Sequence, residues 1–137
     1  MPHYYPLKRM NKVEKLRTVN NLLKLREYCL SIKNATEDMP FKEEEYLIFK
    51  VLGKWFAVIP LKDYELNISV KCDPAKAIEL REQYNCVEPA WHFNKKYWNC
   101  ITLNRDMNDE TVKFWIRHSV EEVVKKLSKT MQVEYWN

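Results

Sequence analysis

The chain has a single glycine, Gly53, among its 137 residues. Phosphate loops of the P-loop and dinucleotide-binding kinds need several glycines, because backbone N–H groups must approach the phosphates closely. The G-x-S-x-G and H-E-x-x-H patterns of common hydrolases and zinc proteases are also absent. The sequence therefore offers no support for catalysis, and we expect a protein that is not an enzyme.

Long apolar runs are missing as well. No stretch approaches the roughly 18 apolar residues that a membrane-spanning helix needs. The N-terminus lacks the charged-then-apolar pattern of a signal peptide. We expect a cytoplasmic protein that makes no use of a membrane.

The cysteines are not paired in the sequence. They stand at Cys29, Cys72, Cys86 and Cys100, with no C-x-x-C pattern of a zinc ribbon or a redox site. Cys29 and Cys72 fall in register with apolar neighbours, which predicts buried, reduced thiols. His92, Cys72 and Cys100 lie on different predicted strands, but alternation puts Cys72 with the core residues, so the three or four convergent donors of a zinc site are not expected. We expect no metal and no cofactor.

What remains is an ordinary globular composition, with 46% hydrophobic and 31% charged residues. A chain of this length can bury one core as a single domain. The net charge is only +4, but residues 1–33 hold eight Lys or Arg against two Glu, whereas residues 34–49 have a net charge of −4. A mildly basic protein is compatible with a nucleic-acid partner, although charge alone does not establish one.

The apolar periodicity predicts an α+β fold. We expect a first helix over 11–32, a hairpin of 46–52 and 54–61 around Gly53, and a strand over 66–72. A second helix should follow Asp73-Pro74, then strands at 88–93 and 98–103 joined by 94–97. A last helix should begin after Asn108-Asp109. The segment 34–40 reads as a loop. This order predicts one antiparallel sheet of about five strands with all three helices on one face.

The faces of these elements follow from helical and strand geometry. The second helix has a narrow apolar side made by Ala77, Ile78, Leu80, Arg81 and Tyr84. His118 lies opposite the buried stripe of the last helix, so a surface histidine is expected.

The sheet face away from the helices is a second candidate surface. Lys50 and Lys71 are expected on it. In the strand after Gly53 both sets of alternate residues are apolar, so one set must point away from the helices. Either Trp55 or Phe56 therefore also lies on this second face. Such a face suits the stacking of bases or a protein partner.

Basic and aromatic side chains gather in the segment 92–98. Lys95 and Lys96 suit phosphates, and Tyr97 and Trp98 suit stacking on bases or contact with sugars. The alternative interpretation is a solvated turn whose lysines keep it soluble. Our candidate nucleic-acid-binding residues are Lys54, Lys71, His92, Asn94, Lys95, Lys96 and Trp98.

Four segments, LREYCLS, FKVLGKWFA, KCDP and NKKYWN, resemble the MmcQ/YjbR family of small proteins. The most recognisable element is H-x-N-K-K-x-W-N, which stands here as His92, Asn94, Lys95, Lys96, Trp98 and Asn99. The resemblance covers roughly Asn21 to Lys126. It implies a CyaY-like fold and DNA binding through a "double-wing" motif. The frataxins share that fold and bind iron through an acidic first helix, whereas the first helix here is basic, which disfavours iron.

These observations predict a basic N-terminal arm or helix extension over 1–20, an MmcQ/YjbR-like domain over 21–127 and a C-terminal tail over 128–137. The first hypothesis is a monomeric DNA-binding protein that grips the phosphate backbone with its hairpin tips. The alternative is a protein-interaction or adaptor module that uses the aromatic sheet face. A positive band through Lys54, Lys71, Lys95 and Lys96 favours the first, and an apolar patch rimmed by mixed charge favours the second.

Overall fold

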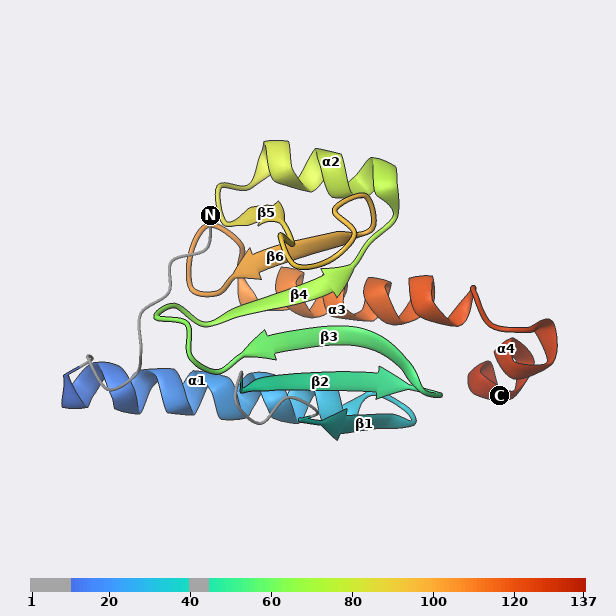
Figure 1. Ribbon diagram of the computed structural model, residues 1–137, viewed down its shortest axis with the longest axis horizontal. Helices are drawn as coiled ribbons and strands as arrows, with labels where there is room; N and C mark the ends of the chain where they lie inside the picture. The colour runs from blue at the N-terminus through green and yellow to red at the C-terminus, as the bar shows by residue number, and fades with distance from the viewer. Residues whose placement is uncertain (1–10, 40–44) are drawn as a thin grey trace.

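The computed structural model describes residues 11–39 and 45–137 (Figure 1). The elements are α1 (Lys12–Ser31), β1 (Ala35–Asp38), β2 (Tyr46–Val51), β3 (Lys54–Pro60), β4 (Asn67–Lys71), α2 (Pro74–Gln83), β5 (Val87–Pro89), β6 (Trp98–Thr102), α3 (Asp109–Val124) and α4 (Lys129–Trp136). Residues 1–10 of the expected basic arm lie outside this description. None of the described helices is long and apolar enough to cross a membrane.

The strands form one antiparallel sheet in the order β1-β2-β3-β4-β6-β5. Within residues 11–39 and 45–137 the sheet has six strands rather than the expected five or so, because β1 lies in the segment 34–40, for which a loop was expected. Its sequence, ATED, is too short and too polar to give a strand signal. The strand is held from both sides, since it pairs with β2 and Glu37 receives hydrogen bonds from Arg26 of α1.

The helices α1 and α3 pass behind the sheet in the view of Figure 1, as expected. The helix α2 lies along the β5 edge and reaches the same core through Ala77 and Leu80. Ile78, expected on the buried side of α2, is instead 56% exposed. The last ten residues, expected to be a tail, contain α4, whose Tyr135 is buried in the core.

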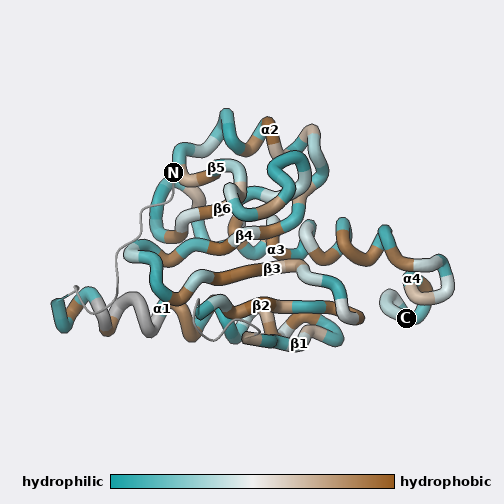
Figure 2. The backbone as a smooth tube through the Cα atoms, viewed as in Figure 1, coloured by the Kyte–Doolittle hydropathy of each residue, from teal (hydrophilic) through white to brown (hydrophobic). Residues whose placement is uncertain are grey.

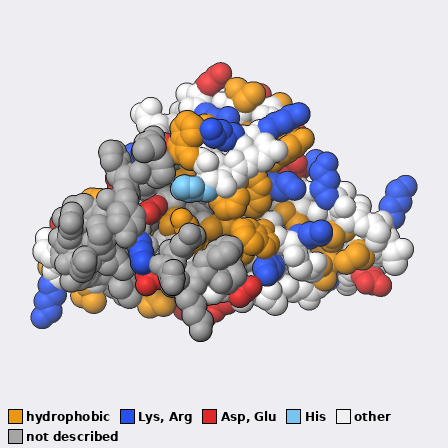
Figure 3. Space-filling model, viewed as in Figure 1, with side chains coloured by type: hydrophobic (Ala, Val, Ile, Leu, Met, Phe, Trp, Pro, Cys, Tyr) orange, Lys and Arg blue, Asp and Glu red, His pale blue; other side chains and the backbone are white. Residues whose placement is uncertain are grey.

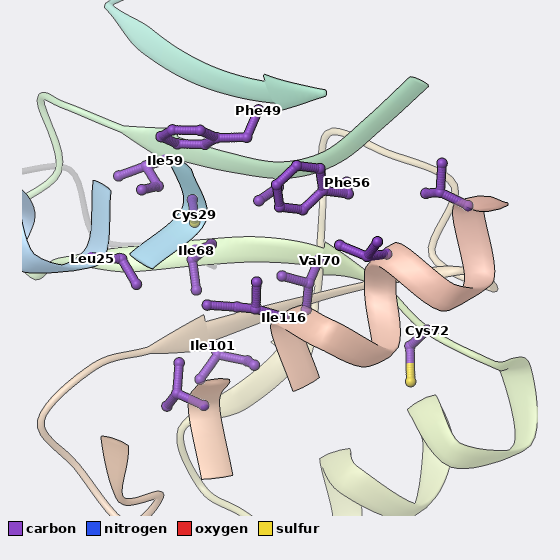
Figure 4. Close-up of a cluster of buried hydrophobic side chains, with 14 of the residues drawn as sticks. Leu25, Cys29, Phe49, Phe56, Ile59, Ile68, Val70, Cys72, Ile101 and Ile116 are labelled. Carbon is purple, nitrogen blue, oxygen red and sulfur yellow. The ribbon is translucent and has the colours of Figure 1, made fainter. Parts of the chain in front are cut away.

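A single hydrophobic core fills the space between the sheet and the helices. Phe49, Phe56, Ile68 and Ile116 meet there and are fully buried (Figure 4). Figure 2 shows that hydrophobic residues follow the central strands and recur along α3. Cys29 and Cys72 belong to this core, as predicted, and all four cysteines carry free thiols. Burial raises the pKa of Cys29 to about 12, so this thiol stays protonated.

A β-bulge decides which aromatic residue of β3 faces the core. Phe49 pairs with Ala57, but the next residue, Lys50, pairs with Trp55, so Phe56 is the extra residue. Phe56 therefore joins the core with Ala57, and Trp55 turns to the face away from the helices. The alternation alone left both assignments open.

Ser119 of α3 fills a gap in the sheet. The strands β3 and β4 pair at Ala57 with Val70 and at Val58 with Ser69. Beyond this point the Ser119 hydroxyl donates to the carbonyl of Phe56 at 2.6 Å and accepts from the backbone N–H of Lys71 at 2.9 Å. One buried side chain thus satisfies two backbone groups that the parted strands would leave without partners.

His118 is buried, so the expectation of a surface histidine was wrong. Its Nε2 accepts a hydrogen bond from the backbone N–H of Asp73, at 3.1 Å, where β4 leads into α2. The expected cap of α2 is confirmed, since the Asp73 carboxylate accepts from the N–H of Lys76. Asn108 caps α3 in the same way at 2.8 Å from Thr111 N. Helix-face geometry missed His118 because the junction of β4 and α2 at Asp73 lies against the side of α3 that a lone helix would expose.

Candidate nucleic-acid interface

The sheet face away from α1 and α3, here named the open face, carries Lys71, whereas Lys54 pairs with the core residue Val51 and lies at the edge of the opposite face. Ile48, Val58, Ser69 and Cys100 form its centre, because their strand neighbours point into the core. Figure 3 shows this face with hydrophobic side chains exposed in its middle and Lys and Arg side chains above and to the right. The centre itself is buried, since Ile48, Val58, Ser69 and Cys100 are 1–8% exposed. The apolar surface seen in Figure 3 therefore comes from other side chains of this face, with positive charge along part of the rim.

Two connections, here named the tips, project at the same end of the sheet. One is the β2–β3 turn at Leu52-Gly53, and the other is the loop 90–97 before β6 (Figure 1). Lys54 begins β3 beside the first connection. Lys71 ends β4 and pairs with Trp98 at the start of β6, next to the second. The fold thus brings Lys54, Lys71 and Trp98, which are far apart in the sequence, to the same end of the sheet.

The segment 90–97 is a loop, so the strand expected over 88–93 was too long. β5 ends at Pro89, and the chain then makes successive turns, with Phe93 N donating to Ala90 O at 3.0 Å. The backbone N–H of Trp98 donates to the carbonyl of Asn94 at 3.0 Å, and the Asn94 side chain accepts from Lys96 N at 3.1 Å. Asn94 therefore shapes the tip that presents the two lysines.

Arg81 and Asn99 fasten this loop to α2. Arg81 Nε donates to Asn99 Oδ1 at 2.7 Å, and its guanidinium also donates to the carbonyl of Lys95. Asn99, only 1% exposed, donates from Nδ2 to the carbonyl of Ala77 at 3.2 Å. Both residues were absent from our candidate set. The available signal was a polar Asn99 at a core-facing position of β6, which must find buried partners.

Aromatic rings lie between the two tips. Trp55 meets Phe93 edge-on at 6.4 Å, and Phe93 stacks on Trp98 at 5.0 Å. We name these three residues the aromatic row. All three are half-buried, so Trp98 is neither a core residue nor a fully exposed ring.

The lysines of the loop lie over neighbouring rings. Lys95 Nζ is 4.5 Å from the centroid of Trp91, and Lys96 Nζ is 5.5 Å from that of Tyr97. Among the described residues, no carboxylate forms an ion pair with Lys54, Lys71, Lys95 or Lys96. Lys50, by contrast, pairs with Asp38 at 3.1 Å. The four candidate lysines keep charge available for an anionic partner.

A hollow of about 530 Å³ lies beside the aromatic row on the open face. Trp55, Trp91 and Phe93 line it, together with the apolar residues at the centre of the sheet. The exposed His92, one of our candidates, lies among the lining residues rather than on the basic tip.

Two carboxylates, Asp63 and Glu88, also line the hollow. Asn67 Nδ2 donates to Asp63 Oδ2 at 2.8 Å, and Cys100 Sγ donates to Asn67 Oδ1 at 3.4 Å. Burial raises the pKa of Asp63, and the hydrogen bond from Asn67 and the nearby His92 partly oppose this rise. Burial also raises the pKa of Cys100 to about 12, which makes this thiol a poor nucleophile.

The part of the chain described here contains no group of three or more His, Cys, Asp or Glu residues arranged to hold a metal ion. The chemistry that these side chains offer is stacking, attraction of anions at one end of the open face and acceptance of hydrogen bonds at the other.

Comparison with known families places the fold and these residues in context. The model of the YjbR family matches residues 30–121, which is more than half of the chain. The chain belongs to the YjbR family. The matched segment extends from the end of α1 into α3 and includes both tips and the open face.

Relatives in this family cover most of the chain. It is 26% identical over 110 residues to the Escherichia coli K12 protein YjbR, which spans 80% of this chain and 90% of that protein. It is 27% identical over 106 residues to YbdF of Escherichia coli O157:H7, spanning 73% and 87%. Both relatives carry the description "uncharacterized", so they support membership of the family but indicate no activity.

Solved structures share the fold. The crystal structure of the Deinococcus radiodurans protein DR2400, from family-model domain DUF419, matches with a TM-score of 0.76 and 31% identity, covering 84% of this chain and 87% of that one. A Pseudomonas syringae crystal structure matches with a TM-score of 0.65 at 20% identity, covering 83% and 99%, and is similar in fold alone.

Proposed function

We propose that this protein is a small, cytoplasmic, non-enzymatic DNA-binding protein that contacts the phosphate backbone through the two tips. The observation that carries the proposal is the placement of Lys54, Lys71, Lys95 and Lys96 at one end of the sheet, without ion-pair partners among the described residues. Phosphate contacts of this kind depend on charge and not on sequence, so weak sequence preference is expected.

The finer features that the family resemblance implies fit this proposal. In a CyaY-like fold with a double-wing motif, the β2–β3 turn at Leu52-Gly53 and the loop 90–97 would be the two wings. The distance between them is bridged by the aromatic row, which offers rings for stacking. A strand lying across this end would meet lysines on both sides and rings between them.

The test is a salt titration of a labelled duplex, followed by fluorescence anisotropy. Each lysine that neutralises a phosphate steepens the plot of log affinity against log salt by about one unit. The double change Lys95→Ala and Lys96→Ala should flatten the slope by up to about two, with the melting curve unchanged. The matched control is Lys12→Ala and Lys24→Ala, since both lysines are exposed on α1, behind the sheet.

Two results would contradict the proposal. One is an equal loss of slope in both double variants, which would mean that net charge and not the tip drives binding. The other is no binding by the unmodified protein at about 50 mM salt. The second result would leave the adaptor hypothesis ahead.

Trp98→Ala separates stacking from folding. If Trp98 stacks on bases, single-strand binding weakens by about 1–3 kcal/mol. If the ring instead serves the fold, the variant loses several kcal/mol of stability and its binding recovers once the folded fraction is taken into account. Because Trp98 is half-buried against Phe93, we expect weaker binding together with a smaller loss of stability.

The alternative, a protein-interaction module, is supported by a specific observation as well. On the open face Trp91 is 43% exposed beside the half-buried Trp55 and Phe93, and Asp63 and Glu88 as well as lysines lie near these rings. Apolar patches with mixed rims are typical of protein interfaces. The salt titration decides between the two, because an apolar interface would show little dependence on salt.

A further inference from the structure

The open face carries opposite charges at its two ends. Lys71 is the last residue of β4, at the end that holds the tips. Asn67 is the first residue of the same strand and donates its hydrogen bond to Asp63 of the hollow. Four residue steps along a strand separate these ends by about 13 Å. The cationic end and the carboxylate end are therefore distinct, but one small ligand is long enough to contact both.

Flat apolar walls connect the two ends. Trp55 and Phe93 belong both to the aromatic row and to the lining of the hollow. A ligand that follows these walls from the lysines meets the rings first, then Glu88, which is in register with Ser69 halfway along β4, and Asp63 last. It must therefore be anionic at one end, flat in the middle and rich in hydrogen-bond donors at the other end.

A nucleotide has this polarity. Its phosphate is the anion, its base is a flat ring, and adenine, guanine and cytosine carry an exocyclic amine that donates hydrogen bonds. The hollow, at about 530 Å³, falls within the range of 300–1,000 Å³ that small-molecule sites occupy. It is therefore large enough for one base with its sugar, whereas a base inside a duplex is stacked and cannot enter.

We propose that the hollow takes one unpaired, amine-bearing base of a bound single strand, whose phosphates lie at Lys71 and Lys95. The inference rests on the proposed function, because the lysines must first bind the strand. The exocyclic amine donates to Asp63 or Glu88, which are acceptors when ionised. Uracil presents a carbonyl oxygen at the position where cytosine presents its amine, so two acceptors would face each other and uracil is disfavoured.

The experiment compares two single strands of equal length, oligo-dC and oligo-dU, by anisotropy at low salt. The two bases differ in their ring edge, where cytosine has the amine and uracil a carbonyl. One hydrogen bond to a charged group corresponds to about a tenfold difference in affinity, so we expect oligo-dC to bind about tenfold more tightly.

Variants in the hollow test the same point. Glu88→Gln combined with Asp63→Asn supplies amide donors and should reduce the dC-to-dU ratio to about one, with the salt slope retained. The matched control is Glu82→Gln, an exposed residue of α2 outside the hollow, which should keep the ratio near ten. Far-ultraviolet circular dichroism shows whether each variant is folded, and Glu88→Gln alone serves if the double variant is not.

The outcomes separate the inference from the proposed function. Equal affinities of the unmodified protein for oligo-dC and oligo-dU, or an unchanged preference in folded hollow variants, would overturn the inference alone. No binding to any strand or duplex would overturn the proposed function and the inference with it. A tenfold preference that disappears only in the hollow variants would support both.

Discussion

A single hydroxyl, that of Ser119, holds the place where β3 and β4 part. Ser119 is fully buried, and its removal leaves the Phe56 carbonyl and the Lys71 N–H without partners. Ser119→Ala should therefore cost about 1–3 kcal/mol of unfolding free energy, measured by urea denaturation. The control is Ser31→Ala, an exposed serine, for which we expect a change within about 0.5 kcal/mol. Equal effects of the two changes would contradict the bridging role.

The buried histidine should make stability depend on pH. Burial lowers the pKa of His118 below its usual value of about 6.5, with opposing contributions from Glu122 and other neighbours. The unfolded chain therefore takes up a proton first as the pH falls. Stability contributed by neutral His118 is full above pH 6.5 and declines below it.

His118→Gln tests this sign, because an amide oxygen can still accept from Asp73 N but does not titrate. Between pH 7.5 and 5.5, urea denaturation should show a smaller loss of stability for His118→Gln than for the unmodified protein. His92→Gln, a change at an exposed histidine, should show the same loss of stability over this pH range as the unmodified protein. A loss that is the same in all three proteins would exclude His118 as its source.

At the scale of elements, the β2–β3 turn contains a residue in an unfavourable conformation. Leu52 has φ of 49° and Gly53 has φ of 79°, so both central positions of the turn are left-handed, as in a type I′ turn. Of the three other described non-glycine residues with positive φ, two are asparagines, with φ of 61° at Asn34 and 62° at Asn104, and the third is Glu45, with φ of 54°. The leucine side chain cannot make the local hydrogen bonds with which an asparagine side chain offsets the cost of the left-handed conformation.

Leu52→Asn should therefore stabilise the protein by about 1 kcal/mol, measured as a higher urea midpoint at an unchanged m-value. Little packing is lost, since Leu52 is 37% exposed. Leu52→Ala keeps a Cβ without a compensating side chain, so it should give no comparable gain. A gain in the alanine variant as large as in the asparagine variant would point to the removal of exposed apolar surface as the cause.

The elements also show what the sequence could predict. Helix starts at Asp73 and Asn108 were predictable because a capping side chain acts on its own neighbours. The orientation of Trp55 was not, because it depends on a bulge that only the pairing with β2 defines. Of the candidate site, the lysine tip was visible in the sequence. The hollow was not, since its walls come together from β2 to β6 only in the folded sheet.

At the scale of the whole molecule, α4 extends the domain beyond the family match, which ends at residue 121. An eight-residue helix has too few turns to display a clear apolar stripe, which explains why the sequence did not reveal it. Its neighbouring aromatics nevertheless differ sharply in environment. Tyr135 is 3% exposed within the core, whereas Trp136 is 58% exposed. Lys33, just after α1, lies 5.8 Å from the Tyr135 ring.

This contrast gives a matched pair of substitutions. Tyr135→Ala should lower the unfolding free energy by about 3 kcal/mol, because it opens a cavity in the shared core. Trp136→Ala removes a larger ring but mostly exposed surface, so its cost should stay below about 1 kcal/mol. Urea denaturation of both variants measures the difference. Equal and small effects would mean that α4 is not needed for the stability of the domain, whereas the expected difference would make it part of the folding unit, attached to the core through Tyr135.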